Sequence, residues 1–281
     1  MSAHPWMPVS PCGEGCVDRS SPSVGPLRAA WRAVAALAVL LCGAVVAPAA
    51  LVARGGAREA LLRRWFRVLL GAFGVRLRLV GPVFQATPGR GVLVVSNHVS
   101  WLDELAIDAV QPIRLVAKRD IRDWPVLGPL ITAARTVYLD RERLSLLPGT
   151  VAELAAALRE GAAVGIHAEG TTWCGVASGR YRPALFQAAL DAGVPVRPVV
   201  LRYLQDGATT TRPAFIGTDT LVDSLRRVLR ARALTVEVHV LDEIAPGRAA
   251  TRHALAALTQ RASEHITLPS TPLPTPHPTP A

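Results

Sequence analysis

Short apolar runs alternate with helix-like stretches along most of the chain from residue 78 onward. The runs are rich in β-branched residues, as buried strands are, and read GVLVVS, IRLVAK, TVYLD, AAVGIHA, VPVRPVVLRY and TVEVHVLDEI. Between and after these runs lie stretches with the spacing of amphipathic helices. They are residues 149–160, 183–192, 218–232 and 249–265. Strands that alternate with helices predict an α/β domain, with a mixed, largely parallel sheet flanked by helices. We expect this domain to span residues 77–266.

Two apolar segments of different character precede this domain. Residues 33–53 carry no charge, and as a helix they would extend about 30 Å, enough for the hydrocarbon core of a bilayer. We expect Pro48 to kink this helix or turn it back. In residues 58–74 apolar side chains recur every three or four positions and arginines occupy the other side, which is typical of a helix at an anionic membrane surface. An ordinary helix packed on a core is the alternative, and we expect residues 27–76 to form a membrane-associated, anchoring helical segment.

Both ends of the chain have compositions typical of disorder. Residues 1–26 form a leader rich in Pro, Ser and Gly, and residues 267–281 form a Pro/Thr-rich tail. Arginines are denser after the uncharged segment than before it, so the positive-inside bias places the domain on the cytoplasmic side of the cell membrane. A cleaved secretory signal is the alternative for the uncharged segment, but the leader in front of it is long for a signal.

Composition narrows the classes of partner. The chain has 281 residues, of which 50% are hydrophobic, and a net charge of +10 in which Lys118 is the single lysine. Such a basic chain attracts nucleic acid, anionic lipid and phosphorylated metabolites. Its arginines are dispersed or close to the uncharged segment, and aromatic residues make up only 5%, too few to stack nucleic acid bases. We therefore expect a bilayer as partner, and no nucleic acid.

The four cysteines, Cys12, Cys16, Cys42 and Cys174, are too few and too scattered for a disulfide framework. Cys12 and Cys16 form a CxxxC pair in the leader, where the sequence places no further metal ligand near them. Metal or redox use of this pair is a minor alternative to two unstructured thiols. We therefore expect no metal site.

Polar residues gather directly after the predicted strands, where α/β sheets carry their chemistry. In NHVSWLD, His98 and Asp103 are five residues apart, which on a regular helix separates them by about 140°, so they can meet only across a turn. If they meet, Asp103 fixes the tautomer of His98 and leaves its other ring nitrogen as a general base. Taken alone, such a pair is more often structural than catalytic. With Asn97 and Ser100 as supports, the chain should leave its strand at 96–97 and bend before Asp103.

Three further polar clusters follow later strands. Lys118 ends one strand as a compact cation suited to an anionic ligand. Arg141 follows the next strand, either as an anion clamp or as a solvated strand end. The third cluster offers backbone N–H groups and hydroxyls after a buried strand, and consists of Glu169, Gly170, Thr171 and Thr172. The Gly-x-Ser-x-Gly elbow of serine hydrolases and the GxxxxGK[ST] phosphate loop are both absent from the sequence.

In this order the clusters resemble those of the glycerolipid acyltransferase family, whose best-known members are the 1-acylglycerol-3-phosphate acyltransferases. The resemblance covers roughly residues 75–205 and rests on NHxSxxD, the two basic strand ends, EGT and the strand GVPVRPVVL. It implies that His98 is the general base and that Asp103 orients it. The residues that it implies for substrate binding are Lys118, Arg141, Glu169, Gly170, Thr171, Thr172 and Pro198.

The resemblance also implies a reaction that needs no enzyme nucleophile and no cofactor. An acceptor hydroxyl would lose its proton to His98 and attack the thioester of acyl-CoA or of an acyl carrier protein. The family's third block usually reads EGTR, whereas this chain has Thr172, so Arg180 or Arg182 is a candidate to replace the missing charge. We expect a membrane-bound O-acyltransferase that converts 1-acylglycerol-3-phosphate to phosphatidic acid. The alternatives are acyl transfer to lyso-ornithine lipid or another lysophospholipid, and a non-catalytic module that binds anionic lipid.

Overall fold

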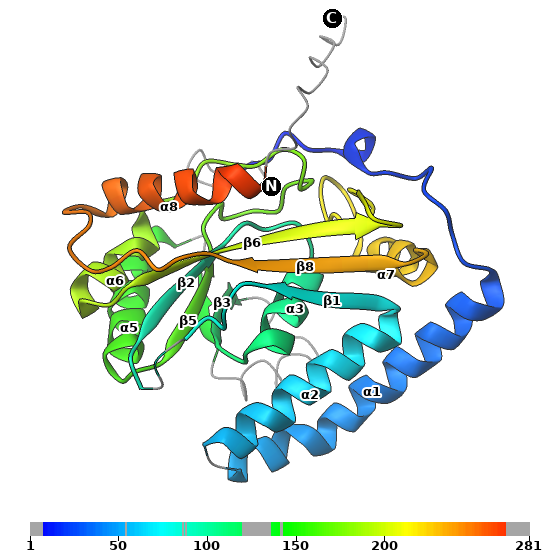
Figure 1. The fold of residues 1–281 in the computed structure, drawn as a ribbon, viewed down its shortest axis with the longest axis horizontal. Helices are drawn as coiled ribbons and strands as arrows, with labels where there is room; N and C mark the ends of the chain where they lie inside the picture. Colours follow the sequence, from blue (N-terminus) through cyan, green and yellow to red (C-terminus); the bar gives the residue numbers. More distant parts are fainter. Residues whose placement is uncertain are drawn as a thin grey trace, which may run out of the picture.

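The computed structural model describes residues 8–53, 55–85, 87, 89–119, 136–140 and 143–267. These residues form a mixed, 8-stranded sheet with the order β1-β8-β6-β2-β5-β3-β4, in which β7 pairs with β6 (Figure 1). The strands are β1 (Val75–Val80), β2 (Val92–Ser96), β3 (Arg114–Lys118), β4 (Val137–Leu139), β5 (Ala163–His167), β6 (Val196–Gln205), β7 (Ala208–Thr209) and β8 (Leu234–Val240). Strand β6 runs antiparallel to β7 and β8, and the other neighbouring strands run parallel. The largely parallel α/β sheet predicted from the sequence is confirmed.

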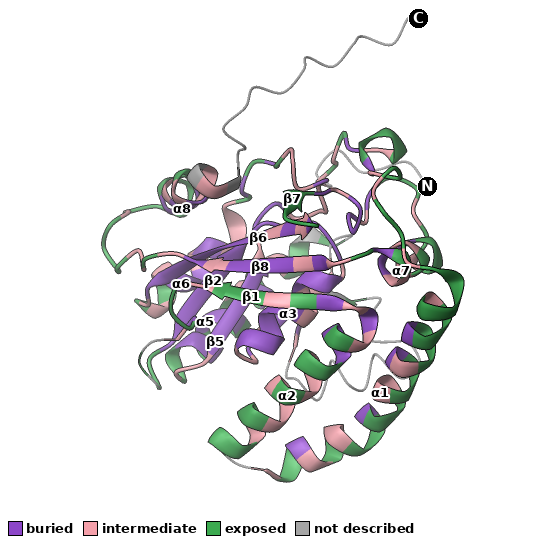
Figure 2. Ribbon diagram, turned by 45° about the vertical axis from the view of Figure 1, so that its right-hand side comes forward, coloured by how far each residue is buried: buried purple, intermediate pink, exposed green. Residues whose placement is uncertain are grey.

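Helices cover both faces of this sheet, because successive side chains of a strand point to opposite faces. The helices are α1 (Pro26–Val52), α2 (Gly56–Phe73), α3 (Leu102–Val110), α5 (Leu147–Arg159), α6 (Gln187–Ala192), α7 (Leu221–Arg230) and α8 (Arg252–Thr267). In β2, Val92 and Val94 join the core beneath α2, α3 and α7, whereas Leu93 and Val95 join the core beneath α5, α6 and α8. Figure 2 shows the central strands buried between these layers.

Residues 8–25, which we expected to be disordered, lie along the domain instead (Figure 1). Ser23 forms a β-bridge with Ala231, and the Val24 N–H donates to the Arg230 carbonyl at 2.8 Å. The Arg212 guanidinium donates to the Ser21 carbonyl. The leader is ordered because its backbone finds these partners between residues 205 and 232, which its own composition does not reveal. Residues 1–7 of the expected leader and 268–281 of the expected tail lie outside the described residues.

Helices α1 and α2 form an antiparallel hairpin beside β1 and α3 (Figure 1). Helix α1 continues past Pro48 to Val52, so the proline does not turn it back as one of our expectations had it. The Trp65 indole N–H of α2 donates to the Val39 carbonyl of α1 at 3.0 Å. The apolar side chains that recur every three or four positions along α2 are not exposed, whereas Val68 on another side of the helix is; the recurring ones are Leu61, Leu62, Trp65, Phe66, Leu69, Leu70 and Phe73. The part of this side from Trp65 to Phe73 packs against the core of the domain, as in our alternative interpretation, whereas Leu61 and Leu62 are half-buried and belong to neither core cluster.

Helix α1 keeps an apolar face on the outside of the protein. Among the described residues it is the helix that is long and apolar enough to cross a membrane. Large side chains that are more than half exposed recur along it every three or four residues, at Leu27, Trp31, Val34, Leu37, Leu41 and Val45. Near its start, the buried Arg32 donates to the carbonyls of Leu229 and Ala231, at 2.9 and 2.7 Å. The first turns of α1 are therefore fixed to the domain.

Close packing between β2 and α5 gives a testable stability effect. Gly91→Ala is expected to lower the free energy of unfolding by about 1–3 kcal/mol, as overpacking does, because the new methyl group would lie 2.0 Å from the Leu158 carbonyl oxygen. Gly149→Ala in α5 is the matched control, since a methyl group there meets nothing within 4 Å. Urea unfolding of both variants checks the prediction, and equal midpoints for the two would contradict it.

Candidate active site

The turn between β2 and α3 brings His98 and Asp103 together. Strand β2 ends at Ser96 and α3 begins at Leu102, so the chain bends between them as the five-residue spacing predicted. The Asp103 N–H donates to the Ser100 carbonyl at 3.1 Å and closes the turn. Across it, His98 Nδ1 lies 2.8 Å from Asp103 Oδ2. The pair therefore has the geometry that an aspartate-oriented histidine requires.

Hydrogen bonds saturate the buried Asp103 carboxylate. Its Oδ2 also accepts the backbone N–H groups of Val99 and Ser100, at 2.6 and 3.0 Å, and its Oδ1 accepts the Tyr203 hydroxyl at 2.6 Å. Burial raises the pKa of Asp103, but the hydrogen bond and charge of His98 outweigh burial and hold the pKa below its ordinary value of 3.8. Burial and the neighbouring Asp103 raise the pKa of Tyr203 well above 10, so Tyr203 stays a neutral donor.

The anionic Asp103 determines which nitrogen of His98 is free. Because Asp103 Oδ2 accepts a hydrogen bond from Nδ1, the Nδ1 atom carries the proton and Nε2 carries the lone pair. The His98 side chain keeps 15% of its surface exposed whereas that of Asp103 keeps none. Nε2 is thus the atom of the pair that can accept a proton from a bound molecule.

Glu169 holds the backbone of the His98 loop. Its Oε2 accepts the His98 N–H at 2.7 Å and its Oε1 accepts the Gly179 N–H at 2.6 Å. The residue is buried, with 2% of its surface exposed. Burial raises the pKa of Glu169 to about 7, against the two backbone hydrogen bonds that lower it. We expected Glu169 to bind substrate, but its carboxylate is used within the protein and joins two loops.

His167 is part of the site, and the sequence interpretation missed it. Its ring stacks on that of His98, with centroids 4.0 Å apart and planes 8° from parallel. Its Nδ1 lies 2.8 Å from Ser96 Oγ, and its Nε2 lies 3.3 Å from Glu104 Oε1. Burial lowers the pKa of His167, but the hydrogen bond and charge of Glu104 outweigh it and raise the pKa above 6.5. The stacked ring fixes the plane of the His98 imidazole.

Asn97 connects the site to the neighbouring strand. Its Nδ2 donates to the Leu201 carbonyl at 3.0 Å, and its Oδ1 accepts the Leu201 N–H at 2.8 Å. Both ends of the amide are therefore occupied by β6. Asn97 supports the turn, as we expected, and has no free group for chemistry.

Gly170 brings three distant segments close together at the start of the third cluster. Its φ of +74° lies in the left-handed region, which favours glycine. A methyl group there would lie 2.8 Å from Pro8 Cγ and 3.8 Å from Arg182 Cγ. We expected Gly170 to approach a ligand, and the structure places the leader and an exposed arginine next to it. Arg182 is thus a cation beside the third cluster, as suggested by the sequence, and Thr171 lies between Gly170 and Thr172, half-buried.

Two other residues expected to bind substrate are used inside the protein. Thr172 Oγ1 donates to the Phe215 carbonyl at 2.5 Å, so this hydroxyl holds a neighbouring loop. Pro198 is buried within β6 and pairs with Val95 of β2. The family resemblance predicts which positions matter, but it does not predict whether a side chain faces the substrate or the core.

The two basic positions at strand ends are described only in part. The backbone of Lys118 ends β3 and pairs with Leu139 of β4, but the structure does not describe its side chain. Arg141 lies outside the described residues. Their expected contacts with the substrate therefore stay predictions.

Three residues of the site lie close enough together to be considered as metal ligands, but their hydrogen bonds make a metal site a poor fit. Ligand atoms of His98, Asp103 and His167 lie within 4.8 Å of one another. However, Asp103 already accepts four hydrogen bonds, and His98 Nδ1 is one of the donors. An ion would have to displace these bonds, whereas a general base uses them as they stand.

A histidine oriented by a buried aspartate after a strand of a largely parallel sheet is the site that the family resemblance implied, and the chain belongs to the acyltransferase family. Residues 81–202 match the Acyltransferase family model. The chain is 33% identical to the lyso-ornithine lipid O-acyltransferase of Pseudomonas aeruginosa, over 73% of this chain and 77% of that protein. It is 36% identical to the 1-acyl-sn-glycerol-3-phosphate acyltransferase of Neisseria meningitidis, over 67% of this chain and 73% of that protein.

A solved structure shows the same fold. The crystal structure of the 1-acyl-sn-glycerophosphate acyltransferase PlsC from Thermotoga maritima superposes with a TM-score of 0.67 and covers 86% of this chain and 93% of its own. The two sequences are 16% identical, so this likeness concerns the architecture. The protein is thus an acyltransferase by family, and it shares its fold with this structure.

Proposed function

We propose that this protein is a membrane-bound lysolipid O-acyltransferase that converts 1-acylglycerol-3-phosphate to phosphatidic acid. The observation that carries the proposal is the His98–Asp103 pair with Nε2 free. His98 Nε2 takes the proton of the acceptor hydroxyl, whose oxygen attacks the carbonyl carbon of the acyl thioester. As the C–O bond forms and the C–S bond breaks, the imidazolium returns the proton to the leaving thiolate. Acyl-CoA or an acyl carrier protein supplies the thioester, and the reaction uses no cofactor.

The choice of acceptor depends on charge beside the third cluster. Arg182 lies next to Gly170 and is exposed, so it offers a cation to the phosphate of 1-acylglycerol-3-phosphate. Lyso-ornithine lipid is the second candidate, because the neutral Thr172 stands where the family usually carries an arginine, and its hydroxyl is held by Phe215. The relatives named above include enzymes for both acceptors.

The exposed apolar face of α1 supports a bilayer as partner. Its large side chains, from Leu27 to Val45, form a stripe that faces away from the domain and suits the acyl region of a membrane. Acyl thioesters of coenzyme A and of carrier proteins are cytoplasmic metabolites. We therefore place the domain on the cytoplasmic face of the cell membrane.

An acceptor panel tests the proposed reaction. Purified protein in lipid nanodiscs is supplied with acyl-CoA and with 1-acylglycerol-3-phosphate, lyso-ornithine lipid or lysophosphatidylcholine, and thiol release is followed. We expect the highest kcat/KM with 1-acylglycerol-3-phosphate. Turnover of lyso-ornithine lipid without turnover of 1-acylglycerol-3-phosphate would replace the first acceptor by the second.

Arg182→Gln is expected to lower kcat/KM for 1-acylglycerol-3-phosphate by about 10-fold to 100-fold, since a hydrogen bond to a charged group contributes roughly 1.5–3 kcal/mol. The loss should come from KM and should be absent with lyso-ornithine lipid, which has no phosphate. Arg180→Gln is the comparison, because Arg180 is the other candidate for this charge and is exposed in the same loop, but it is Arg182 that lies against Gly170. Equal effects of the two substitutions would argue against a specific contact with Arg182.

A further inference from the structure

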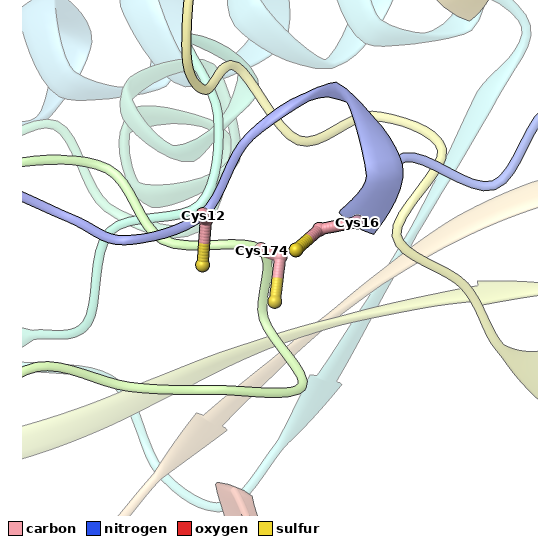
Figure 3. Close-up of side chains that lie close together, drawn as sticks. All are labelled: Cys12, Cys16 and Cys174. Atoms are coloured by element: carbon pink, nitrogen blue, oxygen red, sulfur yellow. The ribbon is translucent and has the colours of Figure 1, made fainter. Parts of the chain in front are cut away.

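Three cysteines from distant parts of the sequence converge beside the loop that carries Glu169. Cys12 and Cys16 belong to the ordered leader, and Cys174 follows the third cluster (Figure 3). Their sulfur atoms lie within 4.8 Å of one another, and all three are free cysteines. No pattern in the sequence predicts this meeting, because the third thiol is far away along the chain. The fold supplies the ligand that the CxxxC pair lacked.

The cluster is built into the protein and is not a chance meeting of surface thiols. Cys12 and Cys174 are buried, with 6% and 4% of their surface exposed, whereas Cys16 is exposed. Cys16 ends the short 3₁₀ helix η1 (Glu14–Cys16), whose turn is closed by a hydrogen bond from the Cys16 N–H to the Gly13 carbonyl at 2.9 Å. The Cys16 thiol points from the end of this turn toward Cys174, and the Cys12 thiol lies beside them (Figure 3).

Backbone groups hold two of these sulfur atoms in place. The Ala177 N–H donates to Cys174 Sγ at 3.3 Å, and the backbone of Cys174 forms a hydrogen bond with the Cys12 thiol. Burial raises the pKa of the Cys12 thiol, so metal binding there would have to release its proton. The leader is held in place nearby, since the Asp18 N–H donates to Thr211 Oγ1 at 2.9 Å.

We propose that Cys12, Cys16 and Cys174 bind one zinc ion. Thiolates prefer zinc among the common divalent ions, and tetrahedral zinc with Zn–S bonds of about 2.3 Å would place the sulfur atoms about 3.8 Å apart. The exposed Cys16 side chain can supply the small contraction by rotation about its own bonds. Within the described residues no fourth His, Cys, Asp or Glu joins the group, so water or an external thiol completes the coordination.

The zinc ion would support the active site by holding a loop in place, and it would take no part in the reaction. It would tie the leader to residues 169–179, and this loop holds His98 from two sides. The Trp173 N–H donates to the His98 carbonyl at 2.8 Å, and Glu169 accepts the His98 N–H. The zinc ion would therefore have a structural role, although one coordination position is left to water or an external thiol, and its binding should stabilise the folded protein.

The experiment uses the full-length, reduced protein, freed of metal by a chelator, and titrates it with Co²⁺ and with Zn²⁺. We expect one Co²⁺ per chain, with the near-ultraviolet absorption of cobalt–thiolate bonds, and displacement of Co²⁺ by Zn²⁺. Cys16→Ser and Cys174→Ala should each weaken binding at least about 100-fold and abolish the rise in Tm that Zn²⁺ produces. Cys42→Ser is the matched control, because Cys42 is exposed on α1, and it should bind like the original protein.

Three results would overturn the proposal. The first is the absence of thiolate absorption with Co²⁺. The second is metal binding that survives Cys16→Ser and disappears in His98→Ala, because the ion would then occupy the group formed by His98, Asp103 and His167. The third is a protein that binds neither ion and instead forms a disulfide within the cluster in air, as mass spectrometry would show. Cys16→Ser changes an exposed side chain, so its loss of binding does not depend on loss of folding.

Discussion

Replacing His98 with alanine is expected to lower kcat by about 10²-fold to 10⁴-fold, the usual contribution of a positioned general base. The variant lacks the nitrogen that takes the acceptor proton, while the substrate contacts of the other residues remain. KM for both substrates should therefore change little. Steady-state kinetics with acyl-CoA and 1-acylglycerol-3-phosphate measure both quantities.

His253→Ala is the matched control, because His253 is exposed on α8. Circular dichroism and vesicle sedimentation should show that His98→Ala keeps its fold and its association with lipid. A variant that retains full activity would remove His98 from the chemistry. If neither the original protein nor His98→Ala turns over substrate, while both bind lipid equally, the result would favour the non-catalytic lipid-binding module.

Asp103→Asn is expected to lower kcat by about 10²-fold or more, although the side chain keeps its size. The amide oxygen can still accept from His98 Nδ1, and the amide nitrogen can face the Tyr203 hydroxyl, which can turn to accept. What is lost is the negative charge that stabilises the imidazolium formed when His98 takes the proton. The kcat of the variant across the pH range tests this, and Asp242→Asn is the control, because Asp242 is exposed.

The same substitution should change how stability depends on pH. The pKa of Asp103 in the folded protein lies below its ordinary value of 3.8, so the unfolded chain binds the proton more readily. The stability contributed by the carboxylate is therefore present above pH 3.8 and is lost as the pH falls through the folded-state pKa. Urea unfolding should show that the free energy of unfolding of the original protein falls as the pH falls through this range. Asp103→Asn should lack this part of the decline. An unchanged acid dependence would mean that Asp103 is not charged in the folded protein.

Much of the sheet was predictable from local patterns. Strand β2 is buried along its whole length, and its sequence is apolar from Val92 to Val95, as expected for a strand covered on both faces. The order of the strands was not predictable, because pairing depends on partners far along the chain. The boundary at residue 77 was two residues late, since β1 begins at Val75 directly after the left-handed Gly74 ends α2.

The leader shows where composition fails as a guide. Pro, Ser and Gly predict disorder when a segment has no partners, but the leader has partners in a distant loop and strand. The Arg212 guanidinium binds its Ser21 carbonyl, and the Gln205 amide binds its Pro22 carbonyl at 2.6 Å. Neither contact leaves a periodic pattern in the sequence.

The site was predictable as far as spacing and motif carry information. The separation of His98 and Asp103 required a turn, and the turn is present. Tyr203 was missed because an aromatic residue inside an apolar strand cannot be told from a core residue by its sequence. His167 had one signal, since it precedes Glu169 in the third cluster in place of the family's usual residues, but nothing in the sequence places its ring on His98.

The contacts of the leader also decide how the protein meets a membrane. Residues 8–25 precede α1 and are bonded to the same domain that follows α2, so both lie on one side of any bilayer. A single crossing by α1 would separate them, so we propose that the α1–α2 hairpin meets a bilayer from one side only. This arrangement would translocate none of the described residues, so the arginine bias would not decide on which side the domain lies. Acceptor lipid would then come from that one leaflet, and product would return to it.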